Sequence, residues 1–186
     1  MVEAGVARAR SLPCDLVKTI PDPEACGFYV KCGFEPISSI TAVDLEVVSR
    51  DLPDGWSRAR WVPQGVVASL PFRLGWSGQA SSAFMWEMCN RPIRVVGEEE
   101  QHPCAQLHSG EAYVQLRYVG GHGALAVAWA DSSVPLKELS NVAQSLAGLL
   151  SIDSVTISVA DTESDELAKM STGVPLRTAE IWARKV

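Results

Sequence analysis

Histidine and cysteine side chains that could bind a metal lie together in one short stretch, His102-x-Cys104-x-x-x-His108. A thiolate and two imidazoles are zinc ligands, but a structural zinc site needs a fourth ligand, usually in a second ligand pair that this sequence lacks. Cys26 and Cys32 have neither a Cys-x-x-Cys spacing nor an adjacent histidine. We therefore expect no metal centre, and we expect these two cysteines to be small core residues.

Aromatic side chains form a second candidate site. Several of the six tryptophans fall, with Phe72 and Phe84, in a segment rich in glycine and proline. Large aromatic side chains fill hydrophobic cores, and they also line ligand pockets, where a few charged groups supply polar contacts. The sequence predicts an aromatic-lined pocket for a small-molecule ligand or a protein partner, with six lining residues: Trp61, Arg73, Trp76, Phe84, Trp86 and Trp129.

The composition excludes several classes of partner. The chain has 186 residues, 47% of them apolar, and a net charge of −6 with scattered basic residues, which disfavours a nucleic-acid surface. No apolar run reaches the roughly 18–20 residues of a membrane span, and no signal peptide is evident. We expect a cytoplasmic protein without a membrane partner, and the odd number of cysteines, five, fits reduced thiols. The sequence leaves a homo-oligomer open.

The clearest structural pattern runs from Tyr113 to Val159. A β-branched and aromatic stretch over 113–119 and an apolar stretch over 125–129 flank the glycine-rich segment 120–123, which predicts a β-hairpin. Leucines then recur at helical spacing over 136–150, and residues 155–159 alternate as a half-buried strand does. A helix with one apolar stripe needs a sheet to cover. We therefore expect an α+β fold with a mixed, mostly antiparallel sheet, helices packed on one face, and an N-terminal β-α-β unit.

The remaining elements follow from weaker patterns. Turn residues after position 48 indicate a boundary between residues 1–48 and 49–186, which we expect to form one continuous globular unit. The other predictions are a helix over 2–10, one or two strands over 61–74, a helix over 79–90, a strand over 93–96, a polar loop over 97–110, a helix over 162–170 and a strand over 176–186.

The N-terminal unit carries a motif. A strand over 15–20 is followed by Asp22-Pro23, a helix start, and Gly33 ends the helix before strands over 34–40 and 42–48. The run Asp22-Pro23-Glu24-Ala25-Cys26-Gly27-Phe28-Tyr29-Val30-Lys31-Cys32-Gly33-Phe34-Glu35-Pro36 resembles the late segment of the GCN5-related N-acetyltransferase (GNAT) family. Ala25, Phe28-Tyr29 and Gly33-Phe34 fall at the family's spacing. The resemblance is limited to residues 15–48.

The resemblance implies acetyl-CoA as the acyl donor and Tyr29 as the general acid that returns a proton to the departing thiolate. In that family, a strand splays from its parallel neighbour to admit coenzyme A, and a Gln/Arg-x-x-Gly-x-Gly/Ala loop binds the pyrophosphate at a helix N-terminus. The nearest match here, from Arg117 to Gly123, has His122 where glycine or alanine is needed and leads into a strand. The phosphate-binding loop is therefore not found in the sequence.

Two functions follow from these observations. The first is a non-catalytic binding module that uses the aromatic pocket and needs no cofactor. The alternative is an acyl-CoA-dependent N-acetyltransferase, GNAT-like, that is incomplete or completed by a second chain. Residues 15–48 packed as a closed unit without a cleft would favour the binding module.

Overall fold

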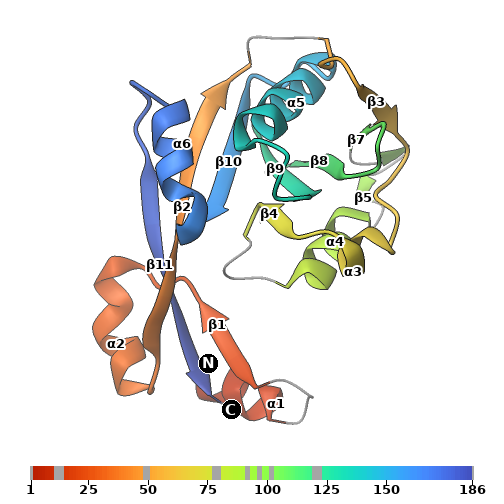
Figure 1. Ribbon diagram of the computed structural model, residues 1–186. Coiled ribbons are helices and arrows are strands. Elements are labelled where there is room, and N and C mark those ends of the chain that lie inside the picture. Colours follow the sequence, from red (N-terminus) through yellow and green to blue (C-terminus); the bar gives the residue numbers. More distant parts are fainter. Residues whose placement is uncertain are drawn as a thin grey trace.

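The computed structural model describes residues 2–10, 15–47, 51–76, 81–90, 93–95, 98–100, 103–118 and 123–185. Within these ranges one nine-stranded sheet dominates (Figure 1). Its strands, in spatial order, are Leu16–Thr19 (β1), Arg177–Lys185 (β11), Glu35–Glu46 (β2), Ser154–Ala160 (β10), Gly123–Ala130 (β9), Ala112–Tyr118 (β8), Cys104–Leu107 (β7) and Trp56–Ala59 (β3), with Phe72–Leu74 (β4) paired to β9. Ile93–Val95 (β5) and Glu98–Glu100 (β6) form a separate pair.

Strand directions confirm the predicted fold class. Among the described strands only β9 and β10 pair in parallel, and every other pairing is antiparallel. The helix that connects this parallel pair is Leu136–Leu149 (α5), as a parallel connection requires. The structure is therefore α+β with a mixed, mostly antiparallel sheet.

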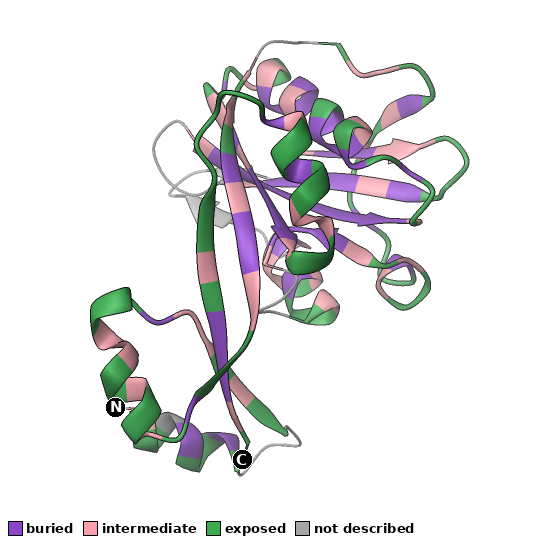
Figure 2. Cartoon of the chain, turned by 60° about the vertical axis from the view of Figure 1, so that its left-hand side comes forward, coloured by how far each residue is buried: buried purple, intermediate pink, exposed green. Residues whose placement is uncertain are grey.

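Strand β9 is buried on both faces and organises the core (Figure 2). Its alanines, from Ala124 to Ala130, face α5, while Leu125, Val127 and Trp129 face the opposite side. Ser164–Met170 (α6) packs beside α5, whereas Val66–Ser69 (α3) and Ser82–Asn90 (α4) cover the opposite face. The helices thus lie on both faces and not only on the predicted one, because a strand apolar on both sides needs two covers.

The N-terminal and C-terminal ends of the chain are built alike. Strand β1, a 3-10 turn at Pro23–Ala25, the helix Cys26–Lys31 (α2) and β2 follow one another. Strand β10, a 3-10 turn at Asp161–Glu163, α6 and β11 repeat that order. The spatial order β1-β11-β2-β10 places the last strand of each module between the two strands of the other. We call these the N-terminal and C-terminal modules.

The two modules form the long ribbon on the left of Figure 1, where α2 lies at the far end from α5. Strands β2 and β11 are antiparallel, so the modules are related by an approximate two-fold axis through that pair. The helix Val2–Ala9 (α1) packs near β1 at the far end of the ribbon. The predicted N-terminal β-α-β unit is present, with β11 between its two strands.

Three local predictions need correction. Residues 66–69 form a short helix, since the Ser69 hydroxyl and the Leu70 N–H turn back to Gly65 and Val66. Residues 104–107, predicted as loop, are a strand because β3 and β8 pair on either side of it. The two strands predicted over 34–48 are one continuous strand, β2. Each correction depends on partners distant in the sequence.

Candidate functional site

Tyr29 lies on α2, and local hydrogen bonds define that helix. Asp22 Oδ1 accepts from the Glu24 N–H at 3.0 Å and so caps the 3-10 turn Pro23–Ala25 that leads into α2. At the other end Gly33 has a φ of +76°, and the Phe34 N–H donates to the Tyr29 carbonyl at 3.0 Å. This is the glycine-terminated helix end that the sequence predicts.

The Tyr29 ring is half-buried and held between two other rings. Phe28 and Phe34 meet it edge-on, with centroids 5.6 and 5.5 Å away. Phe34 belongs to a small core with Val6 and Trp182, so the C-terminal strand β11 supports the ring as well. This packing restricts the direction in which the hydroxyl can point.

The parallel strands β9 and β10 separate along their length. Their pairing runs from Ser154 opposite Gly123 only to Thr156 opposite Leu125. Beyond it, β9 pairs with β4, and the Gly75 N–H donates to the Ser158 carbonyl at 2.9 Å. The Ser158 hydroxyl donates to the Gly75 carbonyl at 2.8 Å. The segment 72–75 therefore fills the space between the two strands.

Arg73 anchors that segment next to the start of α5. Its guanidinium is buried and donates through Nε to Glu163 Oε1 at 2.7 Å, with a second, shorter contact through Nη2. Nη1 donates to the carbonyls of Asp131, at 3.2 Å, and of Val134. Burial makes these charge-assisted bonds stronger than the same contacts on the surface.

The first N–H of α5 already has an anionic partner. The Leu136 N–H donates to Glu166 Oε1 at 3.0 Å, and Pro135 before it has no N–H. Just upstream, the Ser133 N–H donates to Asp131 Oδ1 at 2.8 Å, and this bond, with the Ser133 side chain, holds the pKa of Asp131 below its usual value. The carboxylates Asp131, Glu163 and Glu166 thus surround this helix end.

The structure places the six residues predicted for the aromatic pocket in different surroundings. Phe84 and Trp86 lie on α4, on the wall of a surface pocket. Trp61 is about half exposed beneath the Arg60 guanidinium, and Trp76 is stacked under Arg117, 5.7 Å from its ring centroid. Trp129 and Arg73 are instead buried, at 0% and 9% exposure.

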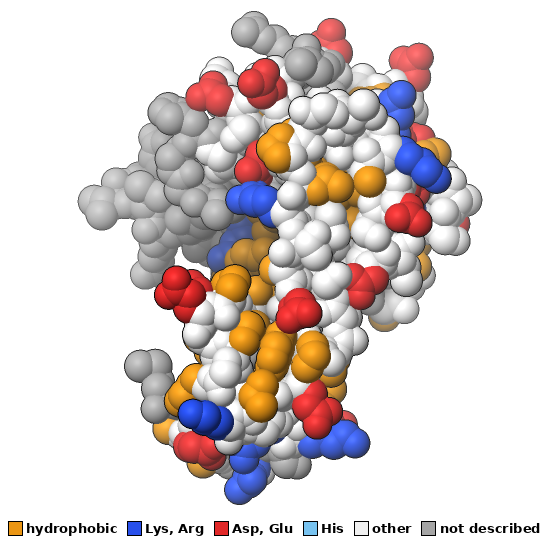
Figure 3. Space-filling view, turned by 90° about the vertical axis from the view of Figure 1, so that its left-hand side faces the viewer, with side chains coloured by type: hydrophobic (Ala, Val, Ile, Leu, Met, Phe, Trp, Pro, Cys, Tyr) orange, Lys and Arg blue, Asp and Glu red, His pale blue; other side chains and the backbone are white. Residues whose placement is uncertain are grey.

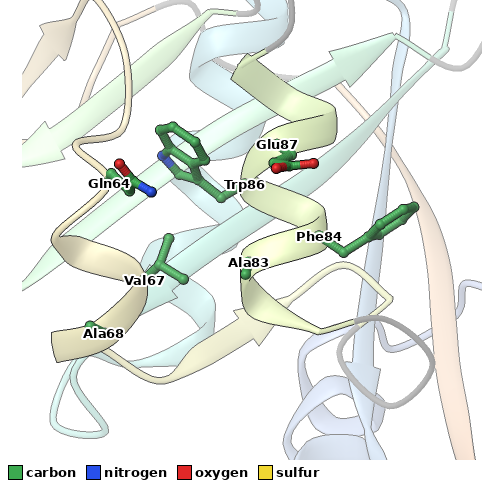
Figure 4. Close-up of a pocket in the computed structure, with 7 residues that line it drawn as sticks. All are labelled: Gln64, Val67, Ala68, Ala83, Phe84, Trp86 and Glu87. Atoms are coloured by element: carbon green, nitrogen blue, oxygen red, sulfur yellow. The ribbon is translucent and has the colours of Figure 1, made fainter. Parts of the chain in front are cut away.

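The pocket lies between α3 and α4 and has a volume of about 630 Å³ (Figure 4). Val67 and Ala83 face each other across it, and the Trp86 indole closes one side, where Nε1 donates to the Val62 carbonyl at 2.7 Å. Gln64 and Glu87 provide polar groups at its rim, and Ala68 and Phe84 complete the lining. Its function stays a prediction.

The metal candidate falls partly outside the described residues, because His102 is not among them. Cys104 is buried in β7 while His108 is exposed in the following turn. Burial raises the pKa of the Cys104 thiol to about 12 and that of Cys89 to about 11, which opposes thiolate formation. In the part of the chain that the structure describes, no three His, Cys, Asp or Glu side chains form a group suited to a metal ion.

Sequence reasoning missed the cluster around Arg73. Glu163 and Glu166 precede or begin a helix, where acidic residues are common because they favour the helix dipole. No local signal distinguishes them from solvent-exposed residues. Their partners, Arg73 and the Leu136 N–H, are distant in the sequence.

Comparison with known proteins agrees with this architecture. No protein-family model and no curated protein matches the sequence. A GCN5-related N-acetyltransferase from Sphaerobacter thermophilus aligns with 99% of this chain and 65% of its own, with a TM-score of 0.60 and 13% identity. A putative acetyltransferase from Pyrococcus horikoshii aligns with 100% of this chain and 58% of its own, with a TM-score of 0.61 and 12% identity.

A probable N-acyltransferase from Enterococcus faecalis V583 gives a TM-score of 0.53 at 16% identity, over 100% of this chain and 48% of its own. The chain therefore has the fold of the GCN5-related N-acetyltransferases over nearly its whole length, and not only in residues 15–48. It spans about half to two-thirds of the length of these structures. Such low identities show the fold alone.

One further finding concerns membranes. None of the helices in the described ranges has the length and apolar character needed to cross a lipid bilayer.

Proposed function

We propose that the chain works in an acyl-CoA-dependent N-acyltransferase of the GNAT type, with Tyr29 as the general acid. The observation that carries this proposal is the position of Tyr29. It lies at the motif spacing on a helix that the Gly33 turn and Phe34 hold in place, in a chain with the GNAT fold. This supports the acyltransferase over a module that only binds ligands.

The role of Tyr29 follows from its hydroxyl and its packing. A phenol keeps a proton at neutral pH and can donate it, and a ring fixed by two neighbours needs little reorganisation to do so. Acetyl-CoA, when bound, would supply the acyl group as a thioester. Tyr29 Oη would carry the proton that passes to the departing thiolate of coenzyme A.

The N-terminal module offers a surface where the remainder of the site would assemble. Strand β1 is the last strand of the sheet among those described, so no described strand pairs with its outer edge. Leu16, Phe28, Val30 and Ile37 are 42–57% exposed on this module, and Figure 3 shows apolar side chains gathered in the lower half of the view. In the C-terminal module the equivalent edge of β10 pairs in parallel with β9. We propose that a further polypeptide segment pairs with β1 in the same way.

The test uses the complete natural reading frame that contains this sequence. Amine-dependent release of coenzyme A from acetyl-CoA is measured over a panel of primary amines and aminated small molecules. Tyr29→Phe is expected to lower the rate by about 10²–10⁴, the usual contribution of a general acid. Tyr113→Phe, which removes a phenol hydroxyl on β8, is the matched control and should leave the rate unchanged.

Two results would overturn the proposal. The first is the absence of amine-dependent release for every acceptor tested. The second is transfer that Tyr29→Phe leaves as fast as Tyr113→Phe does. Circular dichroism of both variants shows whether the fold is retained.

A second candidate function rests on the pocket between α3 and α4. Its lining is mainly apolar, with Gln64 and Glu87 as polar groups, as in small-molecule sites. Trp86 lies on its wall and reports occupancy through its fluorescence. A screen of apolar ligands should change that fluorescence, and Ala83→Trp, which fills the pocket, should abolish the change. A signal that survives Ala83→Trp would place the ligand elsewhere.

A further inference from the structure

In a GNAT fold the acyl donor would lie between the parallel strands and against the helix that joins them. The family admits coenzyme A where parallel strands splay, and binds its pyrophosphate at a helix N-terminus. Among the described residues, β9 and β10 are the parallel pair and α5 is the helix that joins them. The fit of an acyl-CoA can therefore be tested on the residues at the start of α5 and between the two strands.

The start of α5 does not suit a diphosphate. A helix N-terminus binds anions through free N–H groups, but the first of these in α5, the Leu136 N–H, already donates to Glu166. The Glu138 N–H donates to the Pro135 carbonyl at 3.0 Å. A second anion would have to displace the Glu166 carboxylate from a site that the fold itself has filled.

The charges around the start of α5 also disfavour a diphosphate. Arg73 is a cation that hydrogen-bonds to the backbone just before this helix, and Glu163 accepts from both its Nε and Nη2. Its third nitrogen, Nη1, donates to two backbone carbonyls. Asp131, Glu138 and Glu166 then outnumber Lys137, the other cation of this turn, and the excess of negative charge repels a diphosphate.

The space between the strands is filled as well. Leu74 is fully buried there, and Gly75 is bonded to Ser158 on β10 through both its N–H and its carbonyl. Gly75 has a φ of +105°, and a Cβ at this position would lie 3.2 Å from Phe72 Cζ. The close packing and left-handed backbone require glycine, so the segment is fitted closely into this opening.

The C-terminal module also lacks a counterpart of Tyr29. Ala168 follows Asp161 at the spacing at which Tyr29 follows Asp22, and Leu167 precedes it. Neither side chain has a hydroxyl, and Leu167 is fully buried in the main core. The turn of α6 that matches the turn of α2 carrying Tyr29 therefore offers no proton donor.

We infer that residues 51–185 take no acyl-CoA at the start of α5 or between β9 and β10, because the segment 72–75 and Glu166 occupy the places that the donor would need there. This part of the chain acts as a scaffold. It holds β10, β11 and β2 in register and thereby positions the N-terminal module with Tyr29. The inference goes beyond the proposed function and uses it only for the identity of the donor.

Hydrogen exchange read out by mass spectrometry tests the inference on the full chain. Coenzyme A, acetyl-CoA and inorganic pyrophosphate are each added at about 1 mM, where even a millimolar complex is half formed. We expect no slowing of exchange in peptides covering 131–139 and 154–160. Pyrophosphate tests binding at the α5 N-terminus alone. Coenzyme A and acetyl-CoA also test binding in the opening between β9 and β10.

Slower exchange in either peptide with any of these probes overturns the inference. A Glu166→Gln variant repeats the measurement, since Gln still accepts from Leu136 while one negative charge is removed; continued absence of slowing is expected. Slowing confined to residues 16–31 agrees with the inference and with a donor near Tyr29. Failure of the proposed function appears instead as absent amine-dependent release, which leaves the exchange pattern unaffected.

Discussion

Replacing Arg73 with methionine tests whether the Arg73 cluster stabilises the fold. Methionine keeps an apolar stem but removes the guanidinium, so Glu163 is left without its cation and two backbone carbonyls lose a donor. Removing one member of a buried ion pair costs about 3–5 kcal/mol. The Glu163 side chain is 19% exposed and can reach some water, so we expect the lower end, about 3 kcal/mol.

Urea denaturation followed by tryptophan fluorescence measures this loss. With an m-value of about 2–3 kcal/mol/M for a chain of this size, the midpoint should fall by about 1–1.5 M. The matched control is Arg177→Met, because Arg177 pairs with Asp44 on the same sheet with both side chains at least 50% exposed. Exposed pairs contribute about 0–1 kcal/mol, so its midpoint should shift little.

The reasoning also predicts coupling between Arg73 and Glu163. The double variant Arg73→Met/Glu163→Gln should be less destabilised than the sum of the single variants, because neither partner is then left charged and alone. An Arg73→Met variant within about 0.5 kcal/mol of Arg177→Met would refute the stabilising role assigned to this cluster.

Three further predictions concern single positions. Gly75→Ala should lower the free energy of unfolding by about 1–3 kcal/mol through backbone and steric strain. Gly27→Ala, whose methyl group meets nothing within 4 Å, should stabilise α2 by about 0.5–1 kcal/mol. Thermal unfolding of both variants checks that the two effects have opposite signs. The hydroxyl and N–H of Ser39 hold the pKa of Asp161 below its ordinary value of 3.8. This stabilisation is present above that value and is lost as the pH falls through the lower pKa of the folded state. The free energy of unfolding of Ser39→Ala, measured by urea denaturation, should therefore fall less steeply below about pH 4 than that of the unaltered protein. Cys89 and Cys104 should resist alkylation at about pH 8 until urea is added, while half-buried Cys26 and Cys32 react first in peptide mapping.

The sequence predicted the elements whose signal is local. The antiparallel pair β8–β9 follows from two apolar stretches around the glycine-rich segment 120–123, and α5 follows from a leucine stripe. The helix with Tyr29 follows from the Asp22-capped turn before it and from the Gly33 end. In each case short-range hydrogen bonds and periodicity decide the structure, so a window of the sequence contains the needed information.

The sequence could not predict features that depend on distant partners. Strand β7 looks like a polar loop because only its pairing with β3 and β8 makes it a strand. Residue type alone predicts that Arg73 and Trp129 line a pocket. In the structure both are buried, Arg73 against Glu163 and Trp129 against Ser82 of α4. The exchange of strands between the modules has no signature in either segment alone.

The exchange of strands also makes the N-terminal and C-terminal ends of the chain depend on each other. Residues 22–36 carry the Tyr29 motif, but β2 pairs with β10 over Ser154–Ala160 and with β11 beside it. Tyr29 depends through Phe34 on Trp182, near the other end of the chain. The N-terminal module with Tyr29 is therefore held in place by strands of the C-terminal module, whether or not Tyr29 acts as a general acid.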